Sequence, residues 1–206
     1  LEYRFDGLRL DAVHAIDNPE FLKELAHRVR EQVDTGRHVW LTLENELNQA
    51  GLLEYERDFD AQWNDDFHNV MHVLLTGETD AYYSDFAHEP TAKLARCLSE
   101  GFIYQGHTTR HGHERGEPSG HLPPSAFIAF LQNHDQIGNR ALGERLHQLC
   151  SPQALKAATA LLLLSPMIPL MFMGDEVNAS EPFLFFTDHH GELAEAVREG
   201  RRNEFA

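Results

Sequence analysis

The chain has 206 residues, of which 42% are hydrophobic and 24% charged, a composition typical of a globular protein with one sizeable core. Its 33 acidic and 17 basic residues give a formal net charge of −16, which disfavours nucleic acid and anionic membranes as partners. A neutral substrate is compatible with this charge. Cys97 and Cys150 offer no disulfide framework, and free thiols fit a cytoplasmic location.

The first predicted element is a buried strand from Phe5 to Leu10, with Asp11 at its carboxyl end. Alternate strand residues point to the same side, so Arg9 and Asp11 are expected to project together, with the guanidinium favouring the ionised carboxylate. His14 follows closely enough to line the same cavity. A structural Arg–Asp pair is the simpler alternative to a catalytic one.

A strand–helix–strand unit follows from the next two patterns. Asn18 is a good helix cap, and apolar residues recur at helical spacing until Gly36. The stretch His38–Leu43 is the second predicted strand, and it ends at Glu44. Two strands joined by a helix within about 40 residues predict a parallel sheet.

The middle of the chain continues the alternation. Residues 48–59 are predicted to form a loop, Phe59–Trp63 a short strand, and residues 64–77 a helix capped by Asn64. A further helix is predicted from Ser84 to Leu98, with an interruption near Pro90.

The segment Gly101–Pro124 is predicted to be a long surface loop of the kind that forms lids or binding loops. Its histidines lack zinc-like spacing, so no metal is expected there. These histidines are His107, His111, His113 and His121.

Two further strands complete the pattern. The continuous apolar run Ala126–Leu131 predicts a buried strand that leads into Asn133, His134 and Asp135. A helix from Ser151 to Leu164 and a last strand, Ile168–Met173, follow. Prolines divide this apolar region, so neither piece reaches the roughly 20 residues of a membrane span.

Carboxylates therefore end at least three predicted strands, at Asp11, Glu44 and Asp135. In an α/β barrel the carboxyl ends of the strands surround the active site, so we expect part of a (β/α)8 TIM barrel with these acids at one mouth. Such a trio binds a divalent cation or hydrolyses a glycosidic bond. Isolated acids beside sugar-friendly amides favour hydrolysis; these amides are Asn45, Asn48, Asn133, Gln136 and Asn139.

A retaining hydrolase needs one ionised and one protonated carboxyl group about 5–5.5 Å apart. Arg9 beside Asp11 favours an ionised nucleophile, whereas Glu44, framed by Leu43 and Leu47, is the expected proton donor. Asp135 and His134 are expected to hydrogen-bond sugar hydroxyl groups.

The same residues carry a resemblance to the α-amylase family. The stretch Phe5–His14 resembles its nucleophile segment, Leu43-Glu44 its acid/base strand end, and Asn133-His134-Asp135 its third-acid motif. Four longer stretches resemble the trehalose-releasing members of that family: Gln62–Asn69, Phe130–Arg140, Pro182–His189 and Glu192–Phe205.

That resemblance implies that Asp11 is the nucleophile, Glu44 the proton donor and Asp135 the transition-state stabiliser. It implies cleavage of the α-1,4 bond that joins a maltooligosaccharide to a terminal trehalose, with maltooligosyltrehalose as the substrate and no cofactor or metal. The residues implied to line the sugar subsites are Arg9, His14, Trp63, Asp65, Asp66, Phe67, His68, Asn69, His134, Gln136, Ile137, Gly138 and Asn139.

In the family register, residues 1–206 would be one partial catalytic domain, about strands four to eight of the barrel, without the N-terminal barrel half and flanking domains. The family's Gly-Glu-Glu-aromatic run is here Gly174-Asp175-Glu176-Val177-Asn178, a departure that affects the nearby subsites. An amylase, a branching enzyme and a non-catalytic glucan-binding fragment are the alternatives.

Three further features have structural alternatives. Trp63 is as compatible with core packing as with sugar stacking. The run Phe183–Phe186 is expected to be wall or core. Four charged residues are expected to form a solvated helix face: Glu195, Arg198, Arg201 and Arg202.

Overall fold

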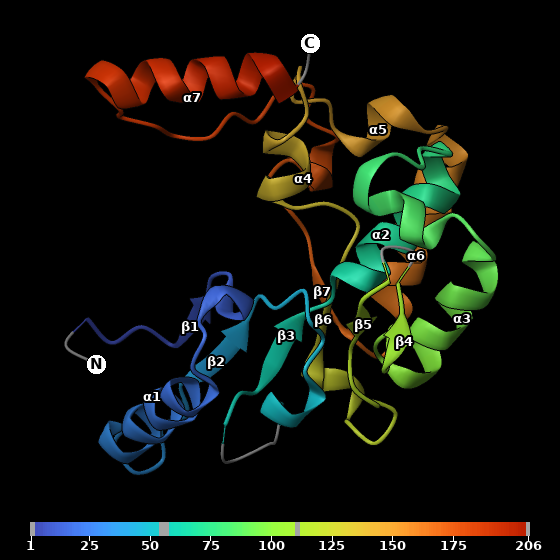
Figure 1. Ribbon diagram of the computed structural model, residues 1–206. Helices are drawn as coiled ribbons and strands as arrows, with labels where there is room; N and C mark the ends of the chain where they lie inside the picture. The colour runs from blue at the N-terminus through green and yellow to red at the C-terminus, as the bar shows by residue number, and fades with distance from the viewer. Residues whose placement is uncertain (1–2, 54–57, 110–111, 205–206) are drawn as a thin grey trace. The chain divides into compact units, whose positions relative to one another are not determined.

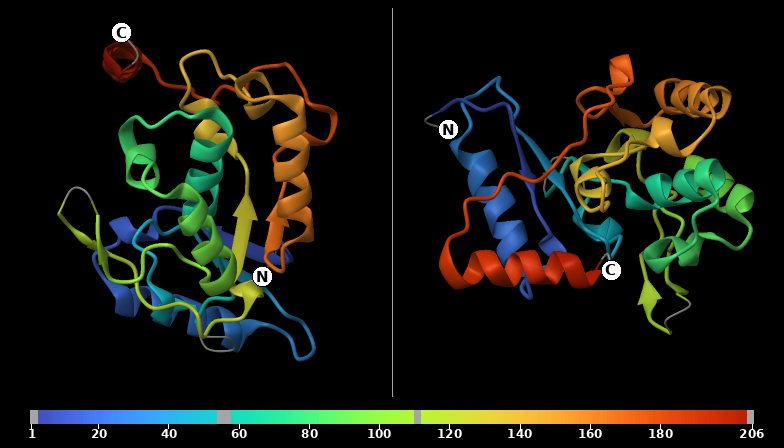
Figure 2. Two further views of the ribbon diagram at one scale, coloured as in Figure 1. Left: turned by 90° about the vertical axis from the view of Figure 1, so that its right-hand side faces the viewer. Right: turned by 90° about the horizontal axis from the view of Figure 1, so that it is seen from above.

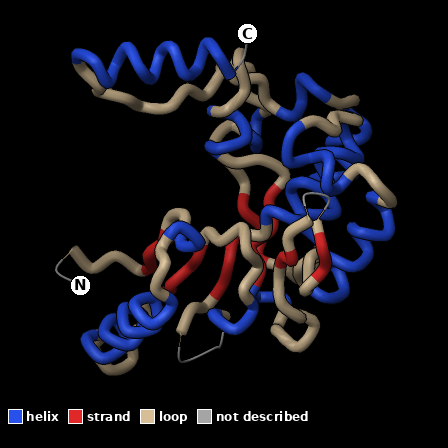
Figure 3. Tube along the Cα trace, viewed as in Figure 1, coloured by secondary structure: helices blue, strands red, loops and turns tan. Residues whose placement is uncertain are grey.

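The computed structural model describes residues 3–53, 58–109 and 112–204. These residues form an α/β structure with a five-stranded parallel sheet (Figures 1 and 3). The chain divides into two compact units, which are treated separately below. The sheet unit comprises Leu1–Leu131 and Cys150–Leu170, and the second unit comprises Gln132–Leu149 and Met171–Ala206.

The sheet confirms the predicted parallel arrangement. Its strands lie in chain order, and each neighbouring pair is parallel. Leu10 pairs with Leu43, so the residues that follow the first two strands begin side by side. The strands are β1 (Gly7–Leu10), β2 (Trp40–Leu43), β3 (Ala61–Trp63), β6 (Phe127–Phe130) and β7 (Ile168–Leu170).

The two edge strands differ from their predicted bounds, and the first is also less buried than predicted. The first strand begins at Gly7, not Phe5, and Leu8 is 44% exposed. The last strand ends at Leu170, not Met173, and Ile168 is exposed. Among the described strands β1 pairs only with β2, and β7 only with β6, so each has one uncovered side.

The helix between β1 and β2 begins where the sequence predicts. The Asn18 side chain accepts a hydrogen bond from the Phe21 amide at 3.1 Å, and α1 runs over Pro19–Gln32. The helix ends four residues before Gly36 because Val33 already has extended backbone angles. A 3₁₀ turn, η1 (Val13–Ala15), links β1 to this helix.

The helix after β3 matches its predicted bounds. Asn64 caps α2 (Asp65–Thr76), and Gly77 ends it in the left-handed region at φ 74°. The next predicted helix is wrong in detail, because η3 (Ala81–Phe86) is a 3₁₀ segment and α3 (Pro90–Glu100) starts at the proline. Proline is tolerated in the first turn of a helix, so it begins α3 and does not interrupt a longer one.

The segment Gly101–Pro124 is more ordered than a surface loop. It contains an antiparallel pair, β4 (His107–Thr108) and β5 (Glu114–Arg115). Phe102 and Ser119, near its two ends, are buried, and the Ser119 hydroxyl accepts from the Phe102 amide at 3.0 Å.

Helices cover the sheet beside β6 and β7 (Figure 2). α2 packs on β6, and α3 and α6 (Pro152–Leu164) pack on α2. Short 3₁₀ turns, η2 (Ala50–Leu52) and η4 (Pro124–Ala126), precede β3 and β6. Residues 54–57 of the predicted 48–59 loop lie outside the described residues. The core of this unit includes Leu41, Leu43, Phe59, Phe67, Phe86, Phe102, Phe127 and Phe130.

A cavity of about 680 Å³ lies on the sheet. It is lined by side chains of four strands and of the segments that lead into them, including Trp40, Thr42, Ala61, Ile128 and Ile168. Within the described part of the chain, no helix is long and apolar enough to cross a membrane.

The second unit contains a short helix that the sequence did not reveal, α4 (His134–Gly138). Its other elements are α5 (Leu146–Leu149), the 3₁₀ turn η5 (Asp175–Val177) and α7 (Gly191–Glu204). The Arg145 side chain holds this unit together, since it donates to the carbonyls of Met173 and Glu181 at 2.8 and 2.9 Å.

Candidate active site

Arg9 lies at the centre of a charged cluster at the carboxyl ends of β1 and β2. Its Nη1 donates to Asp11 Oδ1 at 2.5 Å, and its Nη2 lies 3.0 Å from Glu44 Oε2. One guanidinium therefore contacts both acids that the sequence singled out in this unit. The predicted Arg9–Asp11 pairing is confirmed, and Asp11 remains mostly exposed.

Backbone hydrogen bonds fix Glu44 beside the end of β1. Its amide donates to the Leu10 carbonyl at 2.9 Å, and its carbonyl accepts from the Val13 amide at 3.0 Å. Its carboxylate accepts from the Ala12 amide at 2.8 Å. Ala12 has left-handed backbone angles, with φ 45°, which directs this N–H toward Glu44. Strained backbone of this kind is concentrated at functional sites.

Trp63 forms one wall of the cluster. The Arg9 guanidinium carbon lies 4.1 Å from the centroid of the Trp63 ring, within the range of a cation–π interaction. The ring also packs against Phe130, at 5.8 Å between centroids. Trp63 thus orients Arg9, a role that the sequence did not predict. Its stacking on a sugar stays a prediction.

His14 lies in η1, half-buried, with its Nε2 3.7 Å from Glu46 Oε1. Its position just after Asp11 agrees with the expected placement near the acids. A contact between His14 and a substrate stays a prediction.

The predicted sugar contacts on α2 require correction. Asp66, Phe67, His68 and Asn69 are buried in the sheet unit, so as placed they offer no face to a ligand. Asp66 is 0% exposed and accepts from Asn48 Nδ2 at 2.8 Å and from Arg115 Nη2 at 2.9 Å. Asp65, in the first turn of the helix, is only half-buried, and its sugar contact stays a prediction.

His68 is a neutral core residue. Burial, with a smaller contribution from His72, lowers the pKa of His68 to about 3. Its Nδ1 lies 2.7 Å from the Leu131 carbonyl, which can only accept, so Nδ1 carries the proton. Its Nε2 then accepts from the Tyr83 hydroxyl at 3.2 Å. These bonds hold the end of β6.

The third acid belongs to the second unit. The Asn133 side chain accepts from the Asp135 amide at 2.8 Å, while the Gln136 side chain accepts from the Asn133 amide at 2.9 Å. This capping box sets the start of α4 and uses the side-chain oxygen of Gln136, a residue that the sequence assigned to sugar binding. Asp135 and His134 are partly exposed, and His134 Nε2 lies 3.6 Å from Asp135 Oδ1. The meeting of Asp135 with Asp11 and Glu44 stays a prediction.

Two more predicted contacts in α4 are packing residues. Ile137 and Gly138 are buried, and a Cβ on Gly138 would lie 2.6 Å from the Phe185 ring. Arg201 is not part of a merely solvated face, because its Nη2 donates to the Gly138 carbonyl at 2.9 Å. Asn139 is exposed and accepts from Arg201 at 3.3 Å.

The segment that departs from the family pattern is held by Asp175. Its Oδ1 accepts from Gln132 Nε2 at 2.5 Å and its Oδ2 from the Phe172 amide at 2.9 Å. Burial raises the pKa of Asp175. The sequence placed Asp175 in this departing segment but did not predict its bond to Gln132, which lies 43 residues earlier in the chain.

Two further sets of residues were considered in the sequence, a run of aromatic side chains and a group of histidines. In the run Phe183–Phe186, Phe186 is 93% exposed and is not core, whereas Phe185 lies against Gly138 as a wall residue would. Across the described ranges, no three His, Cys, Asp or Glu side chains group as a metal site requires. His111 lies outside those ranges.

The fold and the charged cluster together resemble one class of protein. A parallel α/β sheet with an Arg–Asp–Glu cluster at the carboxyl ends of its strands is the arrangement expected of α-amylase-type hydrolases. The structure of the chain is similar to a crystal structure from Salmonella typhimurium, provisionally named an alpha amylase. The TM-score is 0.93 at 52% identity, over 99% of this chain and 36% of the other.

The chain is similar over nearly its whole length to part of the malto-oligosyltrehalose trehalohydrolase of several organisms. It is 44% identical to that of Deinococcus radiodurans over 210 residues, which is 99% of this chain and 34% of the relative. It is 39% identical to that of Saccharolobus solfataricus over 211 residues, 98% of this chain and 36% of the relative. The resemblance seen in the sequence is confirmed, and the chain spans about a third of the length of these relatives.

Other comparisons bear on fold alone. The native debranching enzyme of Nostoc punctiforme is 19% identical, with a TM-score of 0.60 over 99% of this chain and 40% of the other. No protein-family profile matches the sequence.

Proposed function

We propose that the chain carries the nucleophile, the proton donor and the third acid of a retaining glycoside hydrolase. The reaction is cleavage of the α-1,4-glucosidic bond next to the terminal trehalose of maltooligosyltrehalose, which releases trehalose. The observation that carries the proposal is the sharing of one guanidinium, that of Arg9, by Asp11 and Glu44.

The two acids are assigned different steps of the reaction. Asp11, exposed and paired with Arg9, attacks the anomeric carbon and forms a glycosyl ester, while Glu44 transfers its proton to the leaving oxygen. Glu44 then takes a proton from water, which releases the sugar from Asp11. Asp135 hydrogen-bonds sugar hydroxyl groups and favours the distorted ring of the transition state.

We assign the five parallel strands to strands four to eight of a (β/α)8 barrel. Three observations support this register. The strands follow chain order, both edge strands have an uncovered side among the described strands, and the 680 Å³ cavity lies where a closed barrel would pack interior side chains. Residues 1–206 would then be one part of a catalytic domain.

The proposed substrate contacts are the partly exposed members of the predicted set. They comprise Arg9, His14, Trp63, Asp65, His134, Gln136 and Asn139. The substrate is a neutral oligosaccharide, which suits the net charge of −16, and no cofactor takes part. We also propose a cytoplasmic location, supported by the two free cysteines, Cys97 and Cys150.

The direct test is incubation of the protein with maltotriosyltrehalose and measurement of the trehalose released. Asp11→Asn removes the nucleophile and should lower kcat about a thousandfold or more. Asp6→Asn is the matched control, because Asp6 precedes the same strand and its side chain is almost fully exposed. If Asp11→Asn retains activity close to that of the Asp6 control, the nucleophile assignment fails.

A second candidate is another α-glucan-active enzyme, such as an amylase or branching enzyme. The Salmonella structure and the altered segment Gly174–Asn178 favour it. Faster consumption of amylose or glycogen than of maltotriosyltrehalose would select this candidate. Binding of maltooligosaccharides in a calorimeter without turnover would select a non-catalytic glucan-binding fragment.

A further inference from the structure

A buried charge lies beneath the loop that follows Glu44. Asp66, at the start of α2, is fully buried, and its carboxylate accepts four hydrogen bonds. The donors are Asn48 Nδ2 at 2.8 Å, the Ile103 amide at 2.8 Å, the Tyr104 amide at 3.1 Å and Arg115 Nη2 at 2.9 Å. The carboxylate thus binds three segments that are distant in sequence.

Arg115 extends this network to the backbone beside Glu44. While Nη2 contacts Asp66, Nε donates to the Glu46 carbonyl at 2.7 Å. The guanidinium is largely buried, and its carbon lies 5.1 Å from the Tyr104 ring centroid. The planar fork of arginine presents two donors in fixed directions, so Asp66 and Glu46 are held at a fixed spacing.

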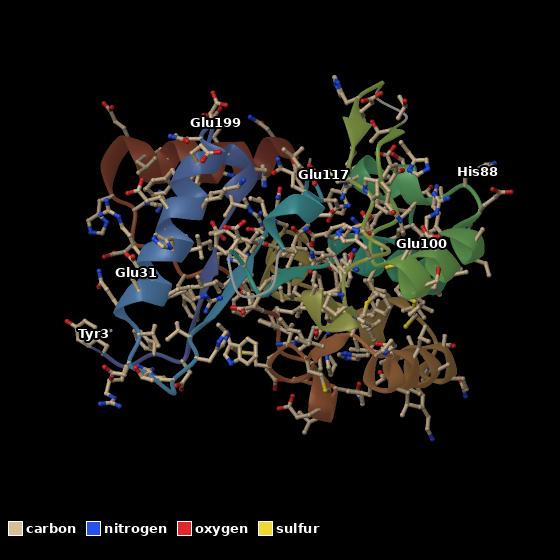
Figure 4. All side chains as sticks on the ribbon, turned by 90° about the horizontal axis from the view of Figure 1, so that it is seen from below. Tyr3, Glu31, His88, Glu100, Glu117 and Glu199 are labelled. Carbon is tan, nitrogen blue, oxygen red and sulfur yellow. The ribbon has the colours of Figure 1, made fainter. Side chains whose placement is uncertain are left out.

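Two further contacts hold the rest of the loop. Gln62 Nε2 donates to the Asn45 carbonyl at 2.8 Å, and the Glu117 amide donates to the Asn48 carbonyl at 3.0 Å. Figure 4 labels Glu117, which also accepts from the Gly51 amide at 2.8 Å. Gln62 belongs to β3 of the five-stranded sheet, whereas Arg115 and Glu117 do not. Of the contacts that these two residues make with the loop, the bond from Arg115 to Glu46 is nearer in sequence to Glu44.

We propose that Arg115 is a positioning residue, held by Asp66, that fixes the Glu44–Asn48 loop and thereby the Glu44 carboxyl group. The proposal rests on the proposed function. Removing two charges from water is costly, and a buried pair of this kind is weak evidence for stability. Its geometry instead links the long segment between α3 and β6 to the loop that follows the proposed proton donor. A purely structural pair would affect unfolding but would not lower kcat in the folded protein.

Arg115→Lys separates these roles. Lysine keeps a charge for Asp66 but lacks the fixed second donor for the Glu46 carbonyl. We expect kcat for trehalose release to fall about tenfold or more with KM within about twofold, because the misplacement of an acid acts on the transition state. The alkaline limb of the pH–kcat profile should also move.

Arg96→Lys is the matched control. Arg96 contacts His107 of the same β4–β5 pair at 3.1 Å but makes no contact with the Glu44–Asn48 loop among the contacts described. This variant should keep the kcat and pH profile of the wild type. Arg115→Ala, assayed with and without guanidinium chloride below denaturing concentrations, provides a second variant in which regained kcat supports the proposal.

A measurement independent of activity distinguishes this inference from the proposed function. Amide exchange at Leu47 and Asn48, whose N–H groups donate to Asn45 Oδ1 and O, should quicken about tenfold in Arg115→Lys relative to Arg96→Lys. If the wild-type protein releases no trehalose, the proposed function fails. Amide exchange then becomes the sole test of whether Arg115 fixes the loop. Unchanged exchange at both amides overturns the inference, as does an unchanged kcat in an active protein.

Discussion

Arg30 donates to Asp60 at 2.7 Å, at the end of the sheet opposite to Arg9 and Asp11. Asp60 precedes β3, is 3% exposed, and also accepts from the Leu41 amide at 2.6 Å and lies 3.0 Å from His38 Nε2. The sheet unit therefore has an Arg–Asp pair at each end of its strands. Only the pair at the carboxyl end stands where parallel α/β proteins carry their chemistry.

The Arg30–Asp60 pair should act on stability and not on catalysis. Asp60→Ala leaves the Arg30 charge without its buried counter-ion and the Leu41 amide without its acceptor, so the free energy of unfolding should fall by about 3–5 kcal/mol. Urea unfolding measures the change. Glu24→Gln, which breaks the exposed Arg28–Glu24 pair, is the control and should change stability by less than about 0.5 kcal/mol. Equal effects of the two substitutions would contradict the assignment.

Arg9 should be essential because one side chain serves two acids. Arg9→Lys provides a single point charge that cannot contact both Asp11 and Glu44 in the observed geometry. We expect kcat to fall about a hundredfold or more. Arg28→Lys, on the exposed face of α1, is the control. Retention of most of the activity by Arg9→Lys would show that the shared guanidinium is structural.

Glu44→Gln tests the role of proton donor. Glutamine preserves the acceptor for the Ala12 amide but supplies no acidic proton, so trehalose release should fall about a thousandfold. A maltosyl fluoride substrate needs no protonation of its leaving group. The loss measured with the fluoride should therefore be much smaller than that with maltotriosyltrehalose. Equal losses with both substrates would exclude Glu44 as the acid.

His68 should make the protein sensitive to acid. Its pKa is lowered to about 3 in the folded state against 6.5 when unfolded, so the unfolded chain binds more protons between these values. Stability is thus fully present above pH 6.5 and falls as the pH drops toward 3, by up to about 1.4 kcal/mol per pH unit. His68→Asn, which keeps a donor for the Leu131 carbonyl, should flatten this slope. The exposed His27→Gln should leave it unchanged.

Gly138 should tolerate no side chain. In Gly138→Ala the new Cβ meets the Phe185 ring at 2.6 Å, and the free energy of unfolding should fall by about 1–3 kcal/mol. A Cβ at Gly200 would meet no atom within 4 Å, so Gly200→Ala within α7 should raise stability by about 0.5–1 kcal/mol. Thermal or urea unfolding measures both changes in stability. Changes of opposite sign confirm the prediction, and changes of the same sign contradict it.

The sequence predicts those features that depend on neighbours along the chain. Asn18 and Asn64 are found as helix caps, and Gly77 ends α2, because capping involves residues only a few positions apart. The parallel pairing of β1 and β2 follows from the strand–helix–strand pattern. The burial of β1 is wrong because it depends on what lies beside the strand, which no local pattern encodes.

In the candidate site, too, only contacts between residues close in sequence could be predicted. Arg9 and Asp11 are two residues apart in a strand, so their pairing follows from the alternation of side chains. The burial of Asp66 could not be predicted, because it depends on Ile103, Tyr104 and Arg115 far along the chain. Trp63 as a support for Arg9 likewise requires three strands in register.

The contacts of Arg115 with Glu46 and Asp66 have a consequence for the order of folding. Arg115 lies 69 residues from Glu46 and 49 from Asp66, so both contacts close long loops, whose entropy must be lost before they form. Helices and neighbouring strands need only local contacts. During refolding, helical circular dichroism should therefore return earlier than enzymatic turnover, with the interval set by the slowest of these long-range closures.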